Sequence, residues 1–441
     1  FSLRDIASWN NTNGYYTLDA GEYEISLREN VWDEVTPTKA NGSKFTFTLD
    51  NAINYRYSYQ TDAEYTNLFA EVEHGPCATP ITYLSRNNWN GTWTNKEDIN
   101  RAADAEKLEG GKALNSWDFE DDQIDDPTPT TGAKNEITLR DMKDAEWDDE
   151  RWDDLLDNLT VQEMKDLINN GGFKTSAAKS IEKAESKDYD GPASAFHSGT
   201  GHPSEVVLAN TWNVEAALLF GESVGKEGAA NGITGWYAPG INTHRSPFGG
   251  RNFEYYSEDP LIGGLMAGNT AQGALKYGVY TYAKHFICND QENSRAGCFV
   301  WASEQSLREI YARGFEIYVD LGGLGIMSSF NCVGSWWAGA NKALLTTLLR
   351  EEWGFHGVVV TDYAGPDYMA TNIGLRAGND LWLNKASYSA SKTYSATPHD
   401  ATILMRRAAK NILYACAHSN NVWTIEDYQE VGIEEVHKTN S

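Results

Sequence analysis

The first 70 residues alternate between apolar and polar positions with a period of two. Tyr15 to Leu18 form a short apolar run, and the segments Tyr23 to Leu27 and Lys44 to Leu49 alternate, with turn residues such as Asp19 and Gly21 between them. This period is typical of strands that bury one face. We therefore predict an antiparallel sheet with one solvent-exposed face, with too few strands for a complete sandwich.

The pattern changes at about residue 150, where helical and strand-like stretches begin to alternate. Trp152, Leu155, Leu156 and Leu159 recur at helical spacing, and a capping box from Thr160 to Glu163 opens the next helix. Further helices are expected over 302–319, 341–354 and 402–416, and strands over 233–237, 279–283, 324–327 and 357–361. This alternation predicts an α/β fold with a parallel sheet, most economically a (β/α)8 TIM-type barrel. A doubly wound open sheet is the alternative, but no GxGxxG motif follows a strand.

These changes divide the chain into four parts. Residues 1–75 form a partial β-domain, 76–150 an acidic irregular linker, 151–420 the barrel and 421–441 an acidic tail. A loop as long as the linker is uncommon inside a compact domain, so we expect it to cross the surface of a neighbouring part. The acidic residues of the linker and the tail are expected to be solvated.

The composition excludes several classes of partner. Asp and Glu number 63 against 36 Lys and Arg, and the net charge of −27 opposes binding to nucleic acids and to anionic membranes. No apolar run is long enough for a transmembrane helix, and the first residues do not have the pattern of a signal peptide. We expect a soluble protein, cytoplasmic or secreted, whose five cysteines are reduced core thiols. Because the chain starts at Phe1 and not at Met, we expect it to be one piece of a longer product or to have lost an upstream segment.

Polar residues follow the predicted strands, where the functional residues of a barrel gather. Asp362 comes directly after the strand-like run 358–361, a place where a carboxylate is costly to bury unless it is paired or used. It is either a nucleophile or a structural acid with a basic partner. Lys284 and His285 follow the run 279–283, and taken alone they are also compatible with a surface ion pair and a core histidine.

Arg251 lies in a loop after another predicted strand. Its guanidinium suits bidentate bonds to vicinal hydroxyls or to a carboxylate, and an ion pair with Glu254 or Glu258 is the alternative. Metal catalysis is not indicated, because the histidines are dispersed and no HxH or HExxH motif occurs. The GxSxG motif of serine hydrolases is absent as well, and no cofactor is implied.

Five motifs in order resemble the catalytic barrel of glycoside hydrolase family 3, in its β-glucosidase branch. They are Asp190-Gly191-Pro192, Gly250 to Glu254 with Ser257 to Pro260, Lys284-His285-Phe286 with Asn289, Gln291, Glu292 and Arg295, Met327 to Asn331, and Thr361-Asp362-Tyr363. The resemblance covers roughly residues 150–385, including Ala377 to Asp380. Any one of these motifs is weak, whereas five in the same order make a chance match very rare.

The resemblance implies a retaining, exo-acting β-glucosidase that removes terminal non-reducing β-D-glucosyl residues from a β-glucoside or an oligosaccharide. Asp362 would be the nucleophile that forms a covalent glycosyl-aspartate. The residues implied to hold the hydroxyls of the sugar are Asp190, Arg251, Lys284, His285 and Arg295. Met327 and Phe330 would line the pocket, and Tyr363 would lie beside the nucleophile.

The chain departs from the family pattern at two pocket positions. The family often has Trp after the nucleophile and Tyr in the Met-x-x-Tyr-Asn motif, where this chain has Tyr363 and Phe330. One pocket hydroxyl is therefore lost and another gained. A β-xylosidase or another exo-β-glycosidase remains an alternative to the β-glucosidase.

A retaining glycosidase also needs an acid/base carboxyl about 5–5.5 Å from the nucleophile. In this family it usually comes from an α/β domain after the barrel, and the residues after Asp380 are too few for such a domain. The opening strands resemble the end of a fibronectin type III-like domain, which precedes the barrel in domain-permuted members. We therefore expect the acid/base on a second chain or on a removed N-terminal part. A non-catalytic carbohydrate-binding fragment is the alternative from another functional class.

Overall fold

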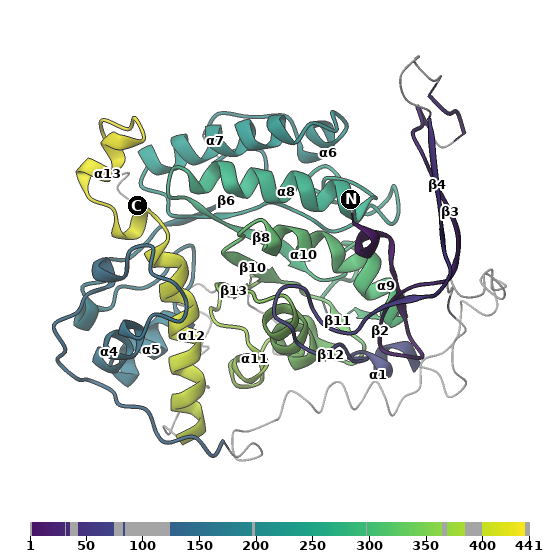
Figure 1. Cartoon of the computed structure of the whole chain (residues 1–441). Helices are drawn as coiled ribbons and strands as arrows, with labels where there is room; N and C mark the ends of the chain where they lie inside the picture. Colours follow the sequence, from purple (N-terminus) through teal and green to yellow (C-terminus); the bar gives the residue numbers. More distant parts are fainter. Residues whose placement is uncertain are drawn as a thin grey trace.

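A computed structural model describes residues 2–30, 32–35, 43–74, 83, 124–195, 199–296, 298–363, 368–383 and 399–436. Its centre is a parallel sheet of five strands in the order β13-β10-β8-β7-β6 (Figure 1). These strands are β6 (Asp188–Asp190), β7 (Gly235–Tyr237), β8 (Tyr280–Phe286), β10 (Gly325–Ser328) and β13 (Val358–Thr361). β7, β8, β10 and β13 are buried at every position, as expected for parallel strands covered on both faces.

Helices pack around this sheet, and the closest pair is α7 (Val214–Ala230) with α8 (Pro260–Leu275). A β-carbon at Gly221 would lie 2.0 Å from the carbonyl oxygen of Thr270, and one at Gly273 would lie 2.2 Å from that of Leu218. Glycine is therefore required where the two backbones meet. The other α-helices are α1 (Ala70–His74), α4 (Arg151–Asn158), α5 (Val161–Asn169), α6 (Glu205–Ala209), α9 (Glu304–Ser306), α10 (Arg313–Asp320), α11 (Thr371–Ala377), α12 (His399–Ala417) and α13 (Ile425–Glu430).

Shorter elements complete the described part of the chain. Segments of 3-10 helix span Leu3–Ile6, Leu139–Met142, Lys179–Ile181, Ala338–Ala340 and Asn420–Val422, and π-helical segments span Leu307–Tyr311 and Ala343–Glu352. A small sheet in the order β12-β11-β9 is formed by β9 (Phe299–Val300), β11 (Cys332–Val333) and β12 (Trp336–Trp337).

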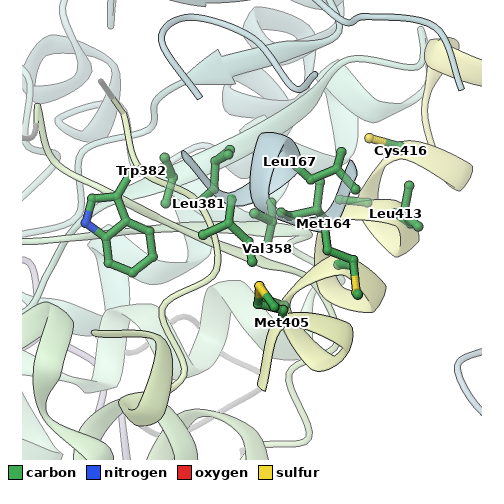
Figure 2. Close-up of a cluster of buried hydrophobic side chains, with 14 of the residues drawn as sticks. Met164, Leu167, Val358, Leu381, Trp382, Met405, Leu413 and Cys416 are labelled. Atoms are coloured by element: carbon green, nitrogen blue, oxygen red, sulfur yellow. The ribbon is translucent and has the colours of Figure 1, made fainter. Parts of the chain in front are cut away.

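The largest hydrophobic cluster joins α5 and α12 to the β13 edge of the sheet (Figure 2). Its members in that region include Met164, Leu167, Val358, Leu381, Trp382, Met405, Leu413 and Cys416. The helical spacing of Trp152, Leu155 and Leu156 is confirmed by α4, which buries all three. The capping box of Thr160 and Glu163 is confirmed at the start of α5.

The expectation of eight regular strands is not met in the described residues, where irregular segments complete the ring. Thr361 N donates to Leu381 O at 2.9 Å, and Trp382 N donates to Ile168 O at 2.8 Å. On the other edge, Asp188 N of β6 donates to Phe173 O at 2.8 Å. Residues 380–382 make three backbone bonds to β13 and two to residues 168–171, and their pairing with β13 is an isolated bridge and not a regular strand. The sheet is therefore a parallel half-barrel whose edges are joined through residues 168–173 and 381–383.

Two predicted elements have different boundaries from those expected. The strand predicted over 279–283 continues to Phe286, so Lys284 and His285 lie within β8 and not after it. Lys284 pairs in register with Met327 of β10, which extends the ladder beyond the apolar run. The helix predicted over 302–319 is divided into α9, the π-helical segment Leu307–Tyr311 and α10.

The N-terminal strands are antiparallel, as predicted, but they form two sheets. β1 (Ser8–Asn10), β2 (Tyr15–Leu18) and β5 (Ile53–Tyr55) form one sheet, and β3 (Gly21–Ser26) pairs with β4 (Lys44–Leu49) in another. The β3-β4 hairpin projects away from the barrel (Figure 1), and none of its residues is fully buried. The expectation of one buried face is therefore wrong for this hairpin, because no second layer among the described residues packs on it.

The segments on either side of the barrel are partly packed against it. The predicted linker is described only at residue 83 and over 124–150, where Leu139 and Met142 are buried; its most acidic part lies mostly outside the described residues. In the predicted tail, α13 and the buried Ile433 pack on a cluster with Val224 and Trp236. The described part of the tail is therefore packed on the barrel through its apolar residues, whereas the side chains of Glu426, Glu430, Glu434 and Glu435 are exposed.

No helix among the described residues is both long and apolar enough to cross a membrane. Cys288, Cys298, Cys332 and Cys416 are free thiols. Cys77 lies outside the described residues.

Candidate active site

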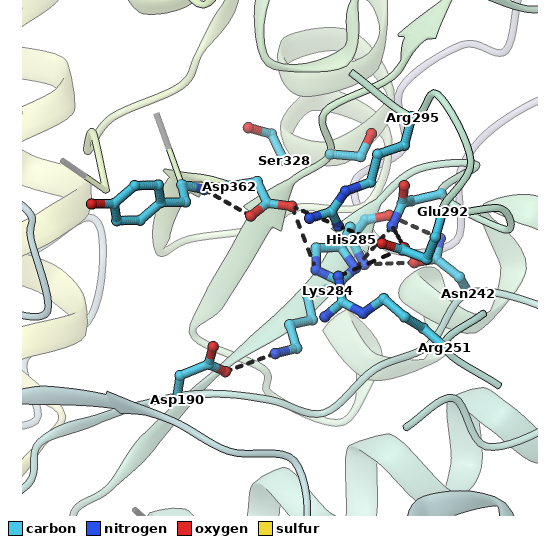
Figure 3. Close-up of polar contacts among 12 residues, drawn as sticks. Asp190, Asn242, Arg251, Lys284, His285, Glu292, Arg295, Ser328 and Asp362 are labelled. Atoms are coloured by element: carbon cyan, nitrogen blue, oxygen red, sulfur yellow. Dashed lines mark hydrogen bonds and ion pairs between the residues drawn. The ribbon is translucent and has the colours of Figure 1, made fainter. Parts of the chain in front are cut away.

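Asp362 lies directly after β13, at the carboxyl end of the sheet, and it is 7% exposed. Its backbone N–H donates to Ser328 O at 2.9 Å, which fixes the turn out of the strand. Carboxylate Oδ1 accepts a 2.7 Å bond from the N–H of Tyr363. Oδ2 lies 3.6 Å from His285 Nε2 and 3.8 Å from Arg295 Nη1 (Figure 3). The carboxylate is thus oriented by the backbone on one side and faces two nitrogen donors on the other.

Burial and nearby cations act in opposite directions on Asp362. Burial raises the pKa of its carboxyl above the ordinary value, and the charges of Arg295, Arg251 and Lys284 and the N–H of Tyr363 partly offset this. The cations therefore favour the ionised form that a nucleophile requires.

Lys284 and Asp190 join β8 to β6 across the end of the sheet. Lys284 is 2% exposed, and its Nζ donates to Asp190 Oδ1 at 2.9 Å and lies 3.5 Å from Glu254 Oε2. Burial acts to lower the pKa of Lys284, but the two carboxylates outweigh it and raise that pKa. Burial acts to raise the pKa of Asp190, but Lys284 and Arg251 outweigh it and lower that pKa. Both groups are therefore charged near neutral pH.

Arg251 forms a close ion pair with the buried Glu254, and its Nη1 lies 3.8 Å from Glu292 Oε1. The ion pair with Glu254 that the sequence left open is therefore present. It does not remove Arg251 from the site, because Arg251, Lys284 and Arg295 converge with Asp362 in one cluster (Figure 3). The guanidinium of Arg251 therefore binds the carboxylate of Glu254 and also faces this cluster.

His285 is buried and held from both its backbone and its ring. Its N–H donates to Asn242 Oδ1 at 2.7 Å, and Asn242 Nδ2 donates to His285 O at 2.9 Å. Ring Nδ1 lies 3.0 Å from the hydroxyl of Tyr255. Burial first, and then Arg251, Lys284 and Arg295, hold the pKa of His285 well below its ordinary value. The imidazole is therefore neutral and takes part in hydrogen bonds without adding charge.

The remaining predicted site residues surround this cluster. Arg295 Nη1 lies 3.2 Å from Glu292 Oε2, and its guanidinium lies 4.5 Å from the ring centroid of Phe330. Arg295 also lines a cavity of about 180 Å3. Met327 is 3% exposed on β10, and Tyr363 is half-buried against the core. The structure thus brings all nine predicted residues to one end of the sheet.

Several further side chains of the site were not predicted. Glu254 was considered only as an ion-pair partner, and Asn242, Tyr255 and Glu292 were given no role, although the motifs contain Glu254 and Glu292. A buried Glu three residues after Arg251 is the only local signal for the first of them. The described residues contain no group of three or more His, Cys, Asp or Glu side chains placed to hold a metal ion.

Comparison with known proteins identifies this arrangement. The model of the glycosyl hydrolase family 3 N-terminal domain matches residues 174–398. The chain belongs to glycosyl hydrolase family 3. The predicted family is therefore confirmed, and so is the fold class at the level of an α/β TIM-like barrel.

Several relatives of this chain carry the name β-glucosidase. A β-glucosidase of Rhizobium radiobacter is 36% identical over 239 residues, which cover 52% of this chain and 29% of that protein. β-Glucosidase A of Butyrivibrio fibrisolvens is 39% identical over 183 residues, 41% of this chain and 22% of that protein. The chain thus matches less than a third of the length of these family 3 relatives.

Solved structures of β-glucosidases are also similar to this chain. β-Glucosidase 3B of Thermotoga neapolitana in complex with glucose has a TM-score of 0.58 and 30% identity, over 65% of this chain and 44% of that one. A β-glucosidase of Paenibacillus barengoltzii has a TM-score of 0.69 at 24% identity, over 95% of this chain and 47% of that one. The second similarity concerns the fold alone, and it extends over nearly the whole chain.

Proposed function

We propose that this chain carries the nucleophile and the sugar subsite of a retaining β-glucosidase. One observation carries the proposal: the buried carboxylate of Asp362 stands at the end of β13, 3.6 Å from His285 Nε2 and 3.8 Å from Arg295 Nη1, beside an ion cluster at the same end of the sheet. The β-glucosidase relatives and the glucose-bound neighbour support glucose as the sugar.

In the first step, a carboxylate oxygen of Asp362 bonds to the anomeric carbon while the bond from that carbon to the leaving oxygen breaks. The leaving oxygen takes the electron pair and receives a proton from the acid. In the second step, water attacks the anomeric carbon, gives up a proton to the conjugate base, and releases Asp362. The configuration at the anomeric carbon is retained because it is inverted twice.

The subsite would be formed by Asp190, Arg251, Lys284, His285 and Arg295. Bonds from ionised groups to sugar hydroxyls are stronger than neutral ones. As positive charge develops on the ring, a bond that the carboxylate of Asp190 accepts from a hydroxyl strengthens further. Met327, Phe330 and Tyr363 would border the sugar. The neutral His285 is suited to this role because it can donate or accept without repelling the cations beside it.

The acid/base is proposed to lie outside the described residues of this chain. Three carboxylates beside Asp362 are already held by a cation: Asp190 by Lys284, Glu254 by Arg251, and Glu292 by Arg295. A carboxylate paired in this way is a poor proton donor, because its ionised form is stabilised. The source would be a second chain or a removed N-terminal part. The N-terminal strands would then be the end of a fibronectin type III-like domain of a permuted enzyme.

Covalent trapping tests this function without the missing acid. The reagent is a 2-fluoro β-glucoside whose dinitrophenolate leaving group departs with little need for protonation. Its fluorine slows hydrolysis of the glycosyl-enzyme. We expect one fluoroglucosyl group on the tryptic peptide that contains Asp362, and release of one equivalent of dinitrophenolate. The corresponding 2-fluoro xyloside is expected to label it more slowly.

The outcomes separate the alternatives. Faster labelling by the xyloside would favour a β-xylosidase, and labelling of another carboxylate would overturn the role of Asp362. Binding of glucose without any labelling would favour a carbohydrate-binding function.

The pH dependence of trapping is expected to report Asp362. Because burial raises the pKa of this carboxyl above 3.8, the inactivation rate constant at saturating reagent falls on the acid side as the group is protonated. His285 stays neutral over this range, so it adds no limb near 6.5. Stopped-flow measurement of dinitrophenolate release gives this profile, and a limb near 6.5 that disappears in His285→Gln would contradict the assignment.

A further inference from the structure

A second layer of buried polar side chains lies beneath the proposed sugar subsite, and nothing in the proposed chemistry uses it. Asp188 on β6 is 0% exposed and accepts a 3.0 Å bond from the hydroxyl of Tyr282 on β8. Tyr282 is also 2.7 Å from the hydroxyl of Tyr280. β6 and β8 are not neighbours, so these side chains meet across the inside of the barrel, over β7.

This layer repeats the arrangement of the subsite one step lower. Asp188 and Asp190 are two residues apart on β6, and Tyr282 and Lys284 are two residues apart on β8. Residues at this spacing point to the same side of a strand. The bond between Asp188 and Tyr282 therefore lies directly under the ion pair between Asp190 and Lys284.

Glycines leave the space that the lower layer occupies. Gly235 stands between Asp188 and Tyr280 in the strand pairing, and a β-carbon there would lie 2.6 Å from Asp188 Oδ1 and 2.9 Å from Tyr282 Cε2. A β-carbon at Gly325 of β10 would lie 2.9 Å from Tyr282 Cδ1. The two side chains thus fill the interior at this level, and the tight fit transmits a change in either of them to the strands.

The lower layer continues to the other side of Asp188 as a chain of hydrogen bonds. The Ser186 hydroxyl lies 3.3 Å from Asp188 Oδ1 and 2.7 Å from the hydroxyl of Thr175. Lys183 Nζ donates to the same Thr175 hydroxyl at 2.8 Å. The titratable groups that face Asp188 are Lys183, Tyr237, Tyr280, Tyr282 and Cys416. Burial first, and then the charges of Asp188 and Asp190, raise the pKa of the Tyr237 hydroxyl.

We propose that Asp188 is a positioning residue for the sugar subsite, which acts through Tyr282 on the part of β8 that carries Lys284. This rests on the proposed function of the subsite. An ionised Asp188 accepts from both Tyr282 and Ser186, whereas a protonated one must donate, so one of these bonds is broken or reversed. Protonation of Asp188 therefore loosens the support of the subsite and weakens sugar binding.

The transition falls in an accessible range. Burial raises the pKa of Asp188 to about 6, although Tyr282, Lys183, Ser186 and Tyr237 act to lower it. Above this value the carboxylate holds the layer together, and below it the layer loosens. The pKa of Asp190 is lowered, so Asp190 stays ionised and does not account for a transition in this range.

The test measures glucose binding by calorimetry in an Asp362→Asn background, which removes the titration of Asp362 itself. We expect the Kd for glucose to rise about fivefold from about pH 7.5 to about pH 5, because coupled groups in one buried network interact at this scale. Adding Asp188→Asn is expected to give, at both pH values, the higher Kd that the Asp362→Asn protein shows at about pH 5. Adding Tyr282→Phe should weaken binding at pH 7.5 as well. The matched control is Tyr256→Phe, which removes an equally buried hydroxyl that bonds to Thr270 on α8, outside this network, and it should leave Kd unchanged.

Two results would overturn the proposal: a Kd that keeps its pH dependence in Asp188→Asn, or an effect of Tyr256→Phe as large as that of Tyr282→Phe. A second readout does not need sugar. This readout is the NMR spectrum of protein labelled with 13C at the aspartate carboxyls, in which the Asp190 signal is identified by its loss in Asp190→Asn. The chemical shift of this signal should change in a step near pH 6. The step should disappear in Asp188→Asn. If the protein binds no glucose, the proposed function fails, and this NMR step alone decides the coupling: its absence refutes the positioning role.

Discussion

Asp362→Asn is expected to lower kcat for hydrolysis of an aryl β-glucoside by about 10^4-fold, which is the scale seen when a side chain of the reacting group is removed. The amide has the same shape as the carboxylate and still accepts from the N–H of Tyr363, so the fold and the subsite are expected to remain. It does not form the glycosyl ester, because the amide is a far weaker nucleophile. Steady-state release of the aryl group measures the loss, and retained glucose binding shows that the site is intact.

Asp290→Asn is the matched control for this experiment. Asp290 is also a buried carboxylate of the same region, but its partner is Arg245 and it has no contact with Asp362. Its kcat is expected to stay within about tenfold of the parent value, as for a change outside the reacting groups. Asp362→Gly adds a further check, since azide should fit the vacated space and yield the α-glucosyl azide. An Asp362→Asn enzyme that keeps more than a hundredth of the parent kcat would refute the role of this residue.

The position of Asp362 could be predicted from the sequence because its signal is local. A buried apolar strand followed at once by a carboxylate is visible in five consecutive residues, and β13 has the predicted extent to within one residue. The helices α4 and α5 were predictable for the same reason, since helical spacing and the capping box lie within about two turns.

The ion cluster could not be predicted from the residues alone because its partners are far apart in the chain. Lys284 and Asp190 are 94 positions apart, and only the order of β6, β7 and β8 in the sheet brings them together. For the same reason the end of β8 was misplaced: Lys284 and His285 are polar, and their place inside the strand depends on charges supplied by other elements. The irregular segments that close the ring show no periodic pattern of apolar residues. The number of regular strands could therefore not be predicted from local sequence patterns.

A buried arginine holds the N-terminal strands to the barrel, and its replacement is expected to have the largest effect on stability. Arg308 is 2% exposed; its Nε donates to Glu304 Oε1 at 2.9 Å and its Nη1 to Glu352 Oε2 at 2.6 Å. Its Nη2 donates to Thr66 O at 3.2 Å, and its guanidinium lies 3.8 Å from the ring centroid of Trp9 on β1. Glu304 in turn accepts the backbone N–H groups that lead from the N-terminal strands into α1.

Arg308→Met is therefore expected to destabilise the protein by about 3–5 kcal/mol, because it leaves two buried carboxylates without their cation. Methionine fills much of the space, so lost charge and lost hydrogen bonds account for most of the effect. Unfolding in urea, followed by tryptophan fluorescence, measures it. Arg151→Met is the control, since Arg151 pairs with Asp149 on the surface, and its midpoint should match that of the parent.

Limited proteolysis separates local detachment from global unfolding in the Arg308→Met variant. If Arg308 joins the two parts, cleavage after residues of the N-terminal strands should accelerate at urea concentrations at which the barrel still gives its native fluorescence. This follows because the contacts of Arg308 with Thr66 and Trp9 belong to the N-terminal part, whereas Glu352 belongs to the barrel. Cleavage that begins only when the barrel unfolds would show instead that the two parts form one cooperative unit, which Arg308 stabilises as a whole.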